Sequence, residues 1–85
     1  MEEAVWYLSF ADDDSGGFLG AVIIKARSFL EAVDKTHMLG INPGGEVVGG
    51  ELRDGLEIAP RCMNVLLTKE RLEQEFGGLV RIGEI

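Results

Sequence analysis

Two strand-like segments joined by a turn restrict the folds open to this chain. Residues 5–11 alternate between two faces with the two-residue period of a β-strand, and residues 18–26 are almost continuously apolar. Between them, residues 12–17 read Asp-Asp-Asp-Ser-Gly-Gly, which is typical of a turn because Asp and Ser bond to nearby backbone and Gly supplies positive φ. We therefore predict an antiparallel hairpin whose second strand, polar only at Lys25, is a central strand covered on both faces.

A helix is predicted next, over residues 29–39. Ser28 and Glu31 have the spacing of a capping box, in which the Ser oxygen accepts from the Glu amide and the Glu carboxylate accepts from the Ser amide. Gly40 suits the left-handed residue after a helix, and Pro43 prevents its continuation. Two sets of side chains have the spacing of its buried face: Leu30, Val33 and His37, or Phe29, Val33 and Thr36.

A third strand is predicted over residues 46–52, although Gly49 and Gly50 weaken its pattern. Glycine inside a strand marks a bulge or a close approach by another backbone or a ligand. The Asp-Gly pair within residues 53–55 is typical of a tight turn, so we predict a short return strand over residues 56–58.

The C-terminal part of the chain predicts a short helix over residues 69–76. Thr68 is placed to cap its N-terminus, and Leu72 and Phe76 are spaced as a buried pair. Residues 79–82 are predicted to pair as an edge strand or to dock on a partner.

These elements together predict one α+β domain spanning residues 1–85, in the order β-β-α-β-β-α. We expect a small antiparallel sheet with one main helix on one face and a short C-terminal helix. The hydrophobic fraction of 46% is that of an ordinary globular protein. Because so short a chain without disulfides has a thin core, and because residues 18–26 are apolar on both faces, we also predict a homo-oligomer.

The charge of the chain limits its partners. Eight basic residues face fifteen acidic ones, giving a net charge of −7, and the basic residues are scattered. This disfavours duplex nucleic acid and an anionic membrane surface, both of which attract basic patches. The acidic N-terminus, the single Cys62 and apolar runs far below the ~20 residues of a membrane span favour a cytoplasmic protein.

The glycine-rich segment over residues 40–50 is the best candidate for a working surface. Five of its eleven residues are glycine, more than one turn requires. Its spacing resembles a P-loop, but Glu46 stands where the P-loop has Lys, and the segment follows a helix instead of preceding one. Two interpretations stay open: a helix stop with a turn and a bulged strand, or a backbone-lined site for a ligand or partner.

The ligand-site interpretation names a specific set of residues. The backbone of the loop would combine with an exposed aromatic side chain and with an Arg or Lys from a neighbouring subunit. Adjacent strand residues point to opposite faces, so one of two neighbouring aromatics can be free for this role. The candidate ligand-binding residues are Trp6, Tyr7, Asn42, Gly44, Gly45, Glu46 and Arg53.

Metal and catalytic sites are not predicted. A calcium loop starting at Asp12 would need an oxygen ligand and a bidentate Glu where Gly16 and Ile23 stand. His37 is the only histidine and Cys62 the only cysteine, too few for a zinc site. A Cys-His nucleophilic pair is the one catalytic alternative that we keep open. We therefore expect no metal, no cofactor and no enzymatic activity.

Four segments carry a resemblance to known sequences: WYLSF, GFLGA, LGINPGGEV and LLTK. They resemble segments of a group of short uncharacterised proteins from phage and related bacterial genomes, and the likeness extends over most of the chain. The group supplies no activity and no site residues. The resemblance implies a phage accessory protein in the host cytosol, a class whose members bind and block host components or sequester nucleotide signals of host defence.

Two hypotheses of function follow. The first is a non-enzymatic protein that binds or sequesters a small nucleotide-like ligand. The second is an acidic interaction module that inhibits a host protein through an exposed sheet edge.

Overall fold

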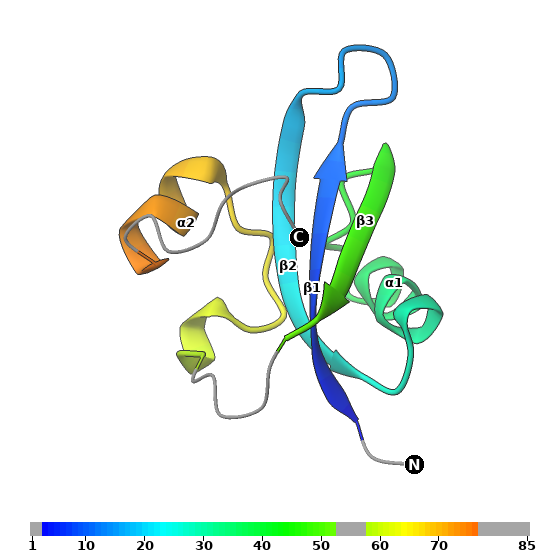
Figure 1. Cartoon of the computed structure of the whole chain (residues 1–85), viewed down its shortest axis with the longest axis vertical. Coiled ribbons are helices and arrows are strands. Elements are labelled where there is room, and N and C mark those ends of the chain that lie inside the picture. The colour runs from blue at the N-terminus through cyan, green and yellow to red at the C-terminus, as the bar shows by residue number, and fades with distance from the viewer. Residues whose placement is uncertain (1–2, 53–57, 77–85) are drawn as a thin grey trace.

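A computed structural model describes residues 3–52 and 58–76, and its centre is a three-stranded antiparallel sheet (Figure 1). The strands are β1 (Ala4–Ala11), β2 (Phe18–Ala26) and β3 (Glu46–Glu51), in the spatial order β2-β1-β3. Helix α1 (Phe29–Met38) connects β2 to β3. A 3₁₀ turn, η1 (Pro60–Cys62), and helix α2 (Lys69–Phe76) follow.

The predicted hairpin is confirmed, but its central strand is β1 and not β2. Ala4 pairs with Ala26 at one end of the hairpin, and Ala11 pairs with Phe18 at the other. Strand β3 then adds to the free side of β1, so β2 lies at an edge of the sheet. The apolar run of β2 correctly predicted that both faces of this strand are covered. The prediction that β2 is the central strand was wrong.

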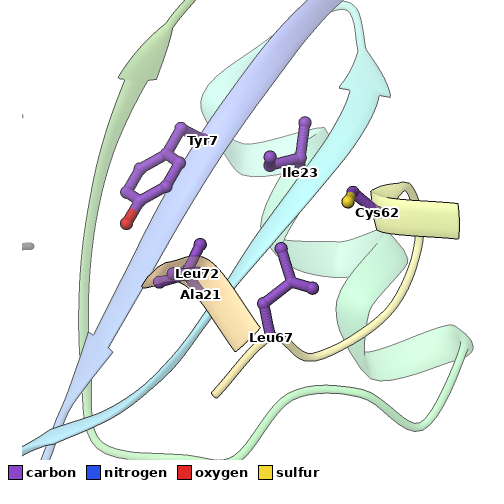
Figure 2. Close-up of a cluster of buried hydrophobic side chains, with 6 residues drawn as sticks. All are labelled: Tyr7, Ala21, Ile23, Cys62, Leu67 and Leu72. Carbon is purple, nitrogen blue, oxygen red and sulfur yellow. The ribbon is translucent and has the colours of Figure 1, made fainter. Parts of the chain in front are cut away.

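The two faces of the sheet carry separate hydrophobic cores. Alternate residues of β1 enter them in turn: Leu8 and Phe10 pack toward α1, and Tyr7 packs toward η1 and α2. The core under α1 also contains Val22, Ile24, Ala26 and Ala32. The core on the other face contains Ala21, Ile23, Cys62, Leu67 and Leu72 (Figure 2). Both apolar faces of β2 are therefore covered within the chain, and the homo-oligomer stays a prediction.

The outer edge of β2 is closed by a segment far away in the sequence. The amide of Ala21 donates to the carbonyl of Leu67 at 2.9 Å, and the amide of Leu67 donates back at 2.7 Å. The amide of Asn64 donates to the carbonyl of Ile23 at 3.0 Å. The carbonyl of Lys25, which is the next along β2 to point away from β1, accepts from the Lys35 ammonium at 2.8 Å. These bonds occupy backbone groups that an exposed edge would offer to another strand.

Helix α1 begins at the predicted cap, with one difference. The Oγ of Ser28 accepts from the amide of Glu31 at 3.1 Å, as expected. The Glu31 carboxylate, however, accepts from the amide and the guanidinium of Arg27, at 3.1 and 2.9 Å, and not from the Ser28 amide. Gly40 has φ +71°, which confirms its left-handed role after the helix.

The buried face of α1 is the second of the two predicted sets. Thr36 and Ala32 are fully buried, and Phe29 and Val33 pack against the core. The first set was wrong, because Leu30 is 73% exposed and His37 is also exposed.

Helix α2 begins where predicted, with the Oγ1 of Thr68 accepting from the amide of Arg71 at 3.2 Å. Its last turn is tied to η1 through Glu75, whose carboxylate accepts from Arg61 at 3.0 Å and from Arg71 at 3.1 Å. The Arg61 bonds, supported by Arg71, lower the pKa of Glu75 from 4.5 to about 2. A carboxylate at a helix C-terminus opposes the helix dipole, so these two arginines offset an otherwise unfavourable charge.

Acid should remove this stabilisation in a defined window. Because the pKa of Glu75 is lower in the folded state than in the unfolded one, its contribution is complete above pH 4.5 and declines as the pH falls toward 2. We expect the stability difference between the parent protein and Glu75→Gln, measured by urea denaturation, to shrink across that range. A difference that stays constant from pH 6 to about 2 would contradict the assigned ion pairs.

The predicted α+β class is confirmed, and the full element order is confirmed only in part. Ile58, the one residue of the predicted 56–58 strand that the structure describes, lies in no strand, so the prediction was wrong at this residue. The turn at 53–55, residues 56–57 and the segment 79–82 lie outside the described residues.

Candidate functional site

The glycine-rich loop is a turn fastened to the end of α1. The amide group of Asn42 donates to the Oγ1 of Thr36 at 3.0 Å and lies 3.3 Å from the Nε2 of His37. Its carbonyl oxygen accepts from the amide of Gly44 at 2.8 Å. The side chain of Asn42 is therefore occupied with holding the loop, which supports the structural interpretation of this segment.

The two central glycines of the loop have different surroundings. Gly44 has φ +86° and open space where a Cβ would stand. Gly45 has φ +76°, and a Cβ there would run into the carbonyl oxygen of Ala11. Gly45 thus permits the loop backbone to lie directly against the end of β1. The neighbouring Glu46 is exposed and begins β3 opposite Ala11.

Gly49 confirms the prediction of a close backbone approach within the third strand. A Cβ at this position would collide with the carbonyl oxygen of Tyr7 and lie 2.8 Å from the Cδ2 of Leu8. The approaching backbone is β1, so this glycine serves the packing of the sheet.

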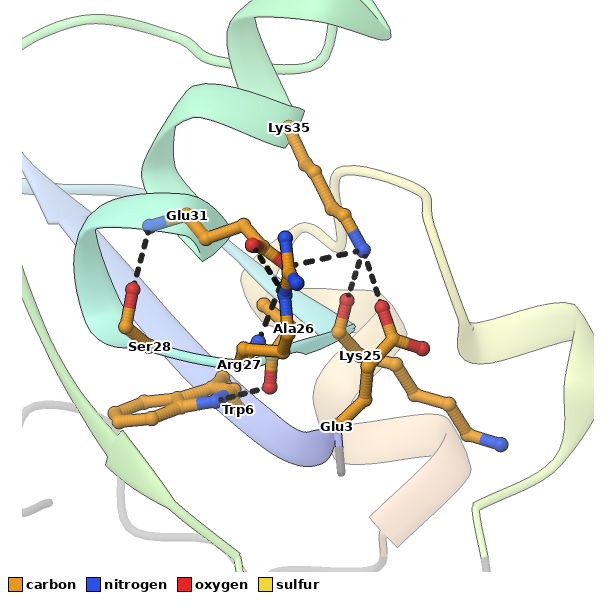
Figure 3. Close-up of polar contacts among 8 residues, drawn as sticks. All are labelled: Glu3, Trp6, Lys25, Ala26, Arg27, Ser28, Glu31 and Lys35. Atoms are coloured by element: carbon orange, nitrogen blue, oxygen red, sulfur yellow. Dashed lines mark hydrogen bonds and ion pairs between the residues drawn. The ribbon is translucent and has the colours of Figure 1, made fainter. Parts of the chain in front are cut away.

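The two candidate aromatics lie on opposite faces, as predicted, and both are packed. The indole N–H of Trp6 donates to the carbonyl of Ala26 at 2.9 Å (Figure 3). The Trp6 ring lies edge-on to that of Phe29, with the two ring centres 6.3 Å apart. Tyr7 is 1% exposed, and burial raises the pKa of its hydroxyl. That hydroxyl has no hydrogen-bond partner among the described residues.

The structure does not bring these candidates into one site. Trp6 pairs with Glu51, whereas Glu46 pairs with Ala11. These two pairs are five residues apart along β3, or about 17 Å at the rise of an antiparallel strand. Asn42, Gly44, Gly45 and Glu46 lie together at one end of the sheet, and Arg53 lies outside the described residues.

A groove on the opposite edge of the sheet is the better candidate site. Its volume is about 870 Å³, and it crosses the outer edge of β2 between α1 and the segment 58–64. Most of its lining is apolar, and the lining residues are Val5, Ile24, Lys25, Lys35, Met38, Leu39, Ile58, Pro60, Met63 and Asn64. Met38, the last residue of α1, is 84% exposed, and Leu39, which follows it, is 54% exposed, so apolar side chains face solvent along this groove.

Two lysines give the groove its charge. The Lys35 ammonium is held by Glu3 at 2.8 Å and by the Lys25 carbonyl, as Figure 3 shows, and its bond with Glu3 raises the pKa of Lys35. The ammonium of Lys25 has no ion-pair partner among residues 3–52 and 58–76. Lys25 is therefore the cation available to an anionic group in the groove.

Sequence reasoning missed this groove because its lining is spread over distant parts of the chain and only one weak local pattern points to it. Its walls come from β1, β2, α1 and the segment 58–64, which meet only in the folded chain. The one available signal was the exposed apolar pair at the end of α1, Met38 and Leu39, next to the glycine that stops the helix.

Cys62 and His37 do not form the nucleophilic pair that the sequence left open as an alternative. Cys62 belongs to the core on the η1 side of the sheet, whereas His37 belongs to α1 on the other side. Burial raises the pKa of the Cys62 thiol, which disfavours the reactive thiolate. Within the described part of the chain, no cluster of three His, Cys, Asp or Glu side chains is arranged to hold a metal ion. Nor does that part contain a helix long and apolar enough to cross a membrane.

Comparison with protein-family models, with curated proteins and with solved structures finds no match to this chain. The resemblance to short phage and bacterial proteins stays a prediction.

Proposed function

We propose that the protein is a non-enzymatic binder of a small, nucleotide-like anion, and that the groove beside β2 is its site. The observation that carries this proposal is a groove of about 870 Å³ with an apolar lining and one available cation, Lys25. That volume is within the range of small-molecule sites, which combine an apolar lining with a few polar groups.

The lining residues suit the parts of a nucleotide. Met63 and Pro60 offer apolar surface to a planar base, and methionine adapts well to ring edges. The Lys25 ammonium suits a phosphate, and the Asn64 side chain can donate and accept hydrogen bonds. A protein that holds such a ligand without converting it lowers the free concentration of that ligand. Sequestration of a host-defence signal in the cytosol is the role that we infer.

An experiment with charge variants tests this proposal. Nucleotides, cyclic dinucleotides and ADP-ribose derivatives are titrated by calorimetry into the parent protein, Lys25→Glu and Lys69→Glu. Lys69 is exposed on α2, away from the groove, so its reversal changes the net charge equally. We expect one ligand class to bind the parent and Lys69→Glu alike, and Lys25→Glu to bind it at least tenfold more weakly, or about 1.4 kcal/mol. Equal binding by all three proteins, or none to any, would reject the groove as a nucleotide site.

A second candidate function is an acidic protein-interaction module. The observation that favours it is the outer edge of β3, whose strand lies at the opposite side of the sheet from the closed edge of β2.

A further inference from the structure

The charged residues are unevenly distributed over the sheet. The six described lysines and arginines lie on or next to β2, on α1, on η1 and on α2: Lys25, Arg27, Lys35, Arg61, Lys69 and Arg71. Strand β1 carries no charged side chain, and β3 carries only Glu46 and Glu51. Asp12, Asp13 and Asp14 follow the end of β1 that pairs with Glu46. The β3 side of the described structure is therefore acidic.

The outer edge of β3 also offers unpaired backbone groups. The amide of Leu52 donates to the carbonyl of Val5 at 2.8 Å, which makes these two residues a hydrogen-bonded pair. Such pairs alternate along an antiparallel ladder, so Gly50, Val48 and Glu46 also point their backbone groups at β1. The groups of Val47, Gly49 and Glu51 then point outward, where no described residue bonds to them.

The side chains along this edge leave room for a further strand. Gly49 and Gly50 carry no side chain, and Val48 is 57% exposed on the face opposite α1. Exposed edges in natural proteins are guarded by bulges, lysines or covering segments, as the edge of β2 is here. Strand β3 has no covering segment among the described residues, and its two charges have the same sign.

We propose that the outer edge of β3 binds an extended basic segment of another protein, which joins the sheet as an antiparallel strand. The proposal rests on the second candidate function and names its surface and partner. Antiparallel pairing is the more stable arrangement per residue. Opposite charges directly across two strands attract, which selects a basic partner over a second copy of this acidic chain.

The register defines the partner's pattern. In a six-residue antiparallel strand, the first residue faces Glu51, the fourth faces Val48 and the sixth faces Glu46. The pattern is therefore basic, any, any, apolar, any, basic. The first, third and fifth amides of the partner point at β3, because they lie opposite its outward groups.

The test uses the capped peptide Arg-Thr-Thr-Val-Thr-Arg and the full chain. We expect saturable binding in a nuclear magnetic resonance titration, with the largest shifts at Val47, Gly49 and Glu51. Glu46→Lys combined with Glu51→Lys should weaken binding at least tenfold, since each cross-strand charge pair is worth up to about fivefold before repulsion is added. The control, Glu70→Lys with Glu73→Lys on the exposed face of α2, changes the net charge equally and should bind like the parent.

A second measurement leaves the protein unchanged and alters the peptide. Methylation of the third amide should abolish binding, because it removes a bond to β3, whereas methylation of the second amide should preserve it. Equal effects of the two methylations, equal losses in the two charge variants, or no binding up to about 1 mM would overturn the proposal. So would a dimer that Val48→Lys dissolves, since the edge would then belong to a second copy. Lys25→Glu should leave peptide binding intact, which separates this result from the groove experiment.

Discussion

Gly45→Ala is expected to destabilise the protein by about 2–5 kcal/mol, the sum of a left-handed backbone penalty and a steric clash. The residue has φ +76°, and the new Cβ would meet the carbonyl oxygen of Ala11, which is fixed in the sheet. Backbone cannot move aside as a flexible side chain can, so the loop or the end of β3 must shift. Urea denaturation monitored by Trp6 fluorescence measures the effect.

Gly44→Ala is the matched control for this experiment. Gly44 has a similar φ of +86° but open space at the Cβ position, so only the left-handed penalty applies, about 1–2 kcal/mol. The difference between the two variants isolates the contact with Ala11. Equal denaturation midpoints would mean that the loop does not lie against β1. Because any side chain at position 45 would be strained, Gly45→Arg cannot test ligand binding at this loop: loss of binding would not be separable from loss of folding.

Leu67→Ala should cost about 2–5 kcal/mol, the range for a leucine removed from a close-packed core. Leu67 is 1% exposed, and Figure 2 shows it in the cluster with Ala21, Ile23 and Cys62. Its backbone exchanges two hydrogen bonds with Ala21, so loosening this residue should also open the edge of β2. We expect faster hydrogen exchange at the amides of Ala21, Asn64 and Leu67, together with a lower denaturation midpoint.

The neighbouring Leu66→Ala provides the comparison with the same chemical change. Leu66 is 36% exposed, so we expect a loss of about 1 kcal/mol and little change in exchange at Ala21. If Leu66→Ala proved as damaging as Leu67→Ala, the segment 63–67 would not be anchored by Leu67 as described.

The local elements of this fold were predictable because their signals are local. The strand Phe18–Ala26 and the helix Lys69–Phe76 have the predicted bounds, and α1 ends one residue early at Met38. Turn residues, a serine cap and a glycine stop act within a few residues of where they stand, so sequence spacing is sufficient to place them. The predicted cap bond was misplaced by a single residue, because the Glu31 carboxylate accepts from the amide of Arg27 instead of that of Ser28.

The candidate site was less predictable. The glycine-rich loop was correctly singled out as unusual, yet the space where a Cβ would stand at Gly45 and Gly49 is taken by the backbone of β1. A glycine required for backbone approach looks the same in sequence whether the neighbour is a strand or a ligand. The two aromatics were correctly assigned to opposite faces, but neither is free to bind a ligand. Trp6 packs against the core under α1, and Tyr7 is buried in the core on the other face.

The sequence by itself determined the hairpin, the two helices and the acidic character of the chain, because periodicity, capping and composition are properties of neighbouring residues. Only the tertiary structure decided that β3 joins β1, that the segment 63–67 closes the edge of β2, and that a groove forms beside Lys25. Each of these features depends on contacts between segments that lie tens of residues apart in the sequence. That choice is made by the packing of the whole chain, since burial of apolar surface is non-directional and only close packing selects one arrangement.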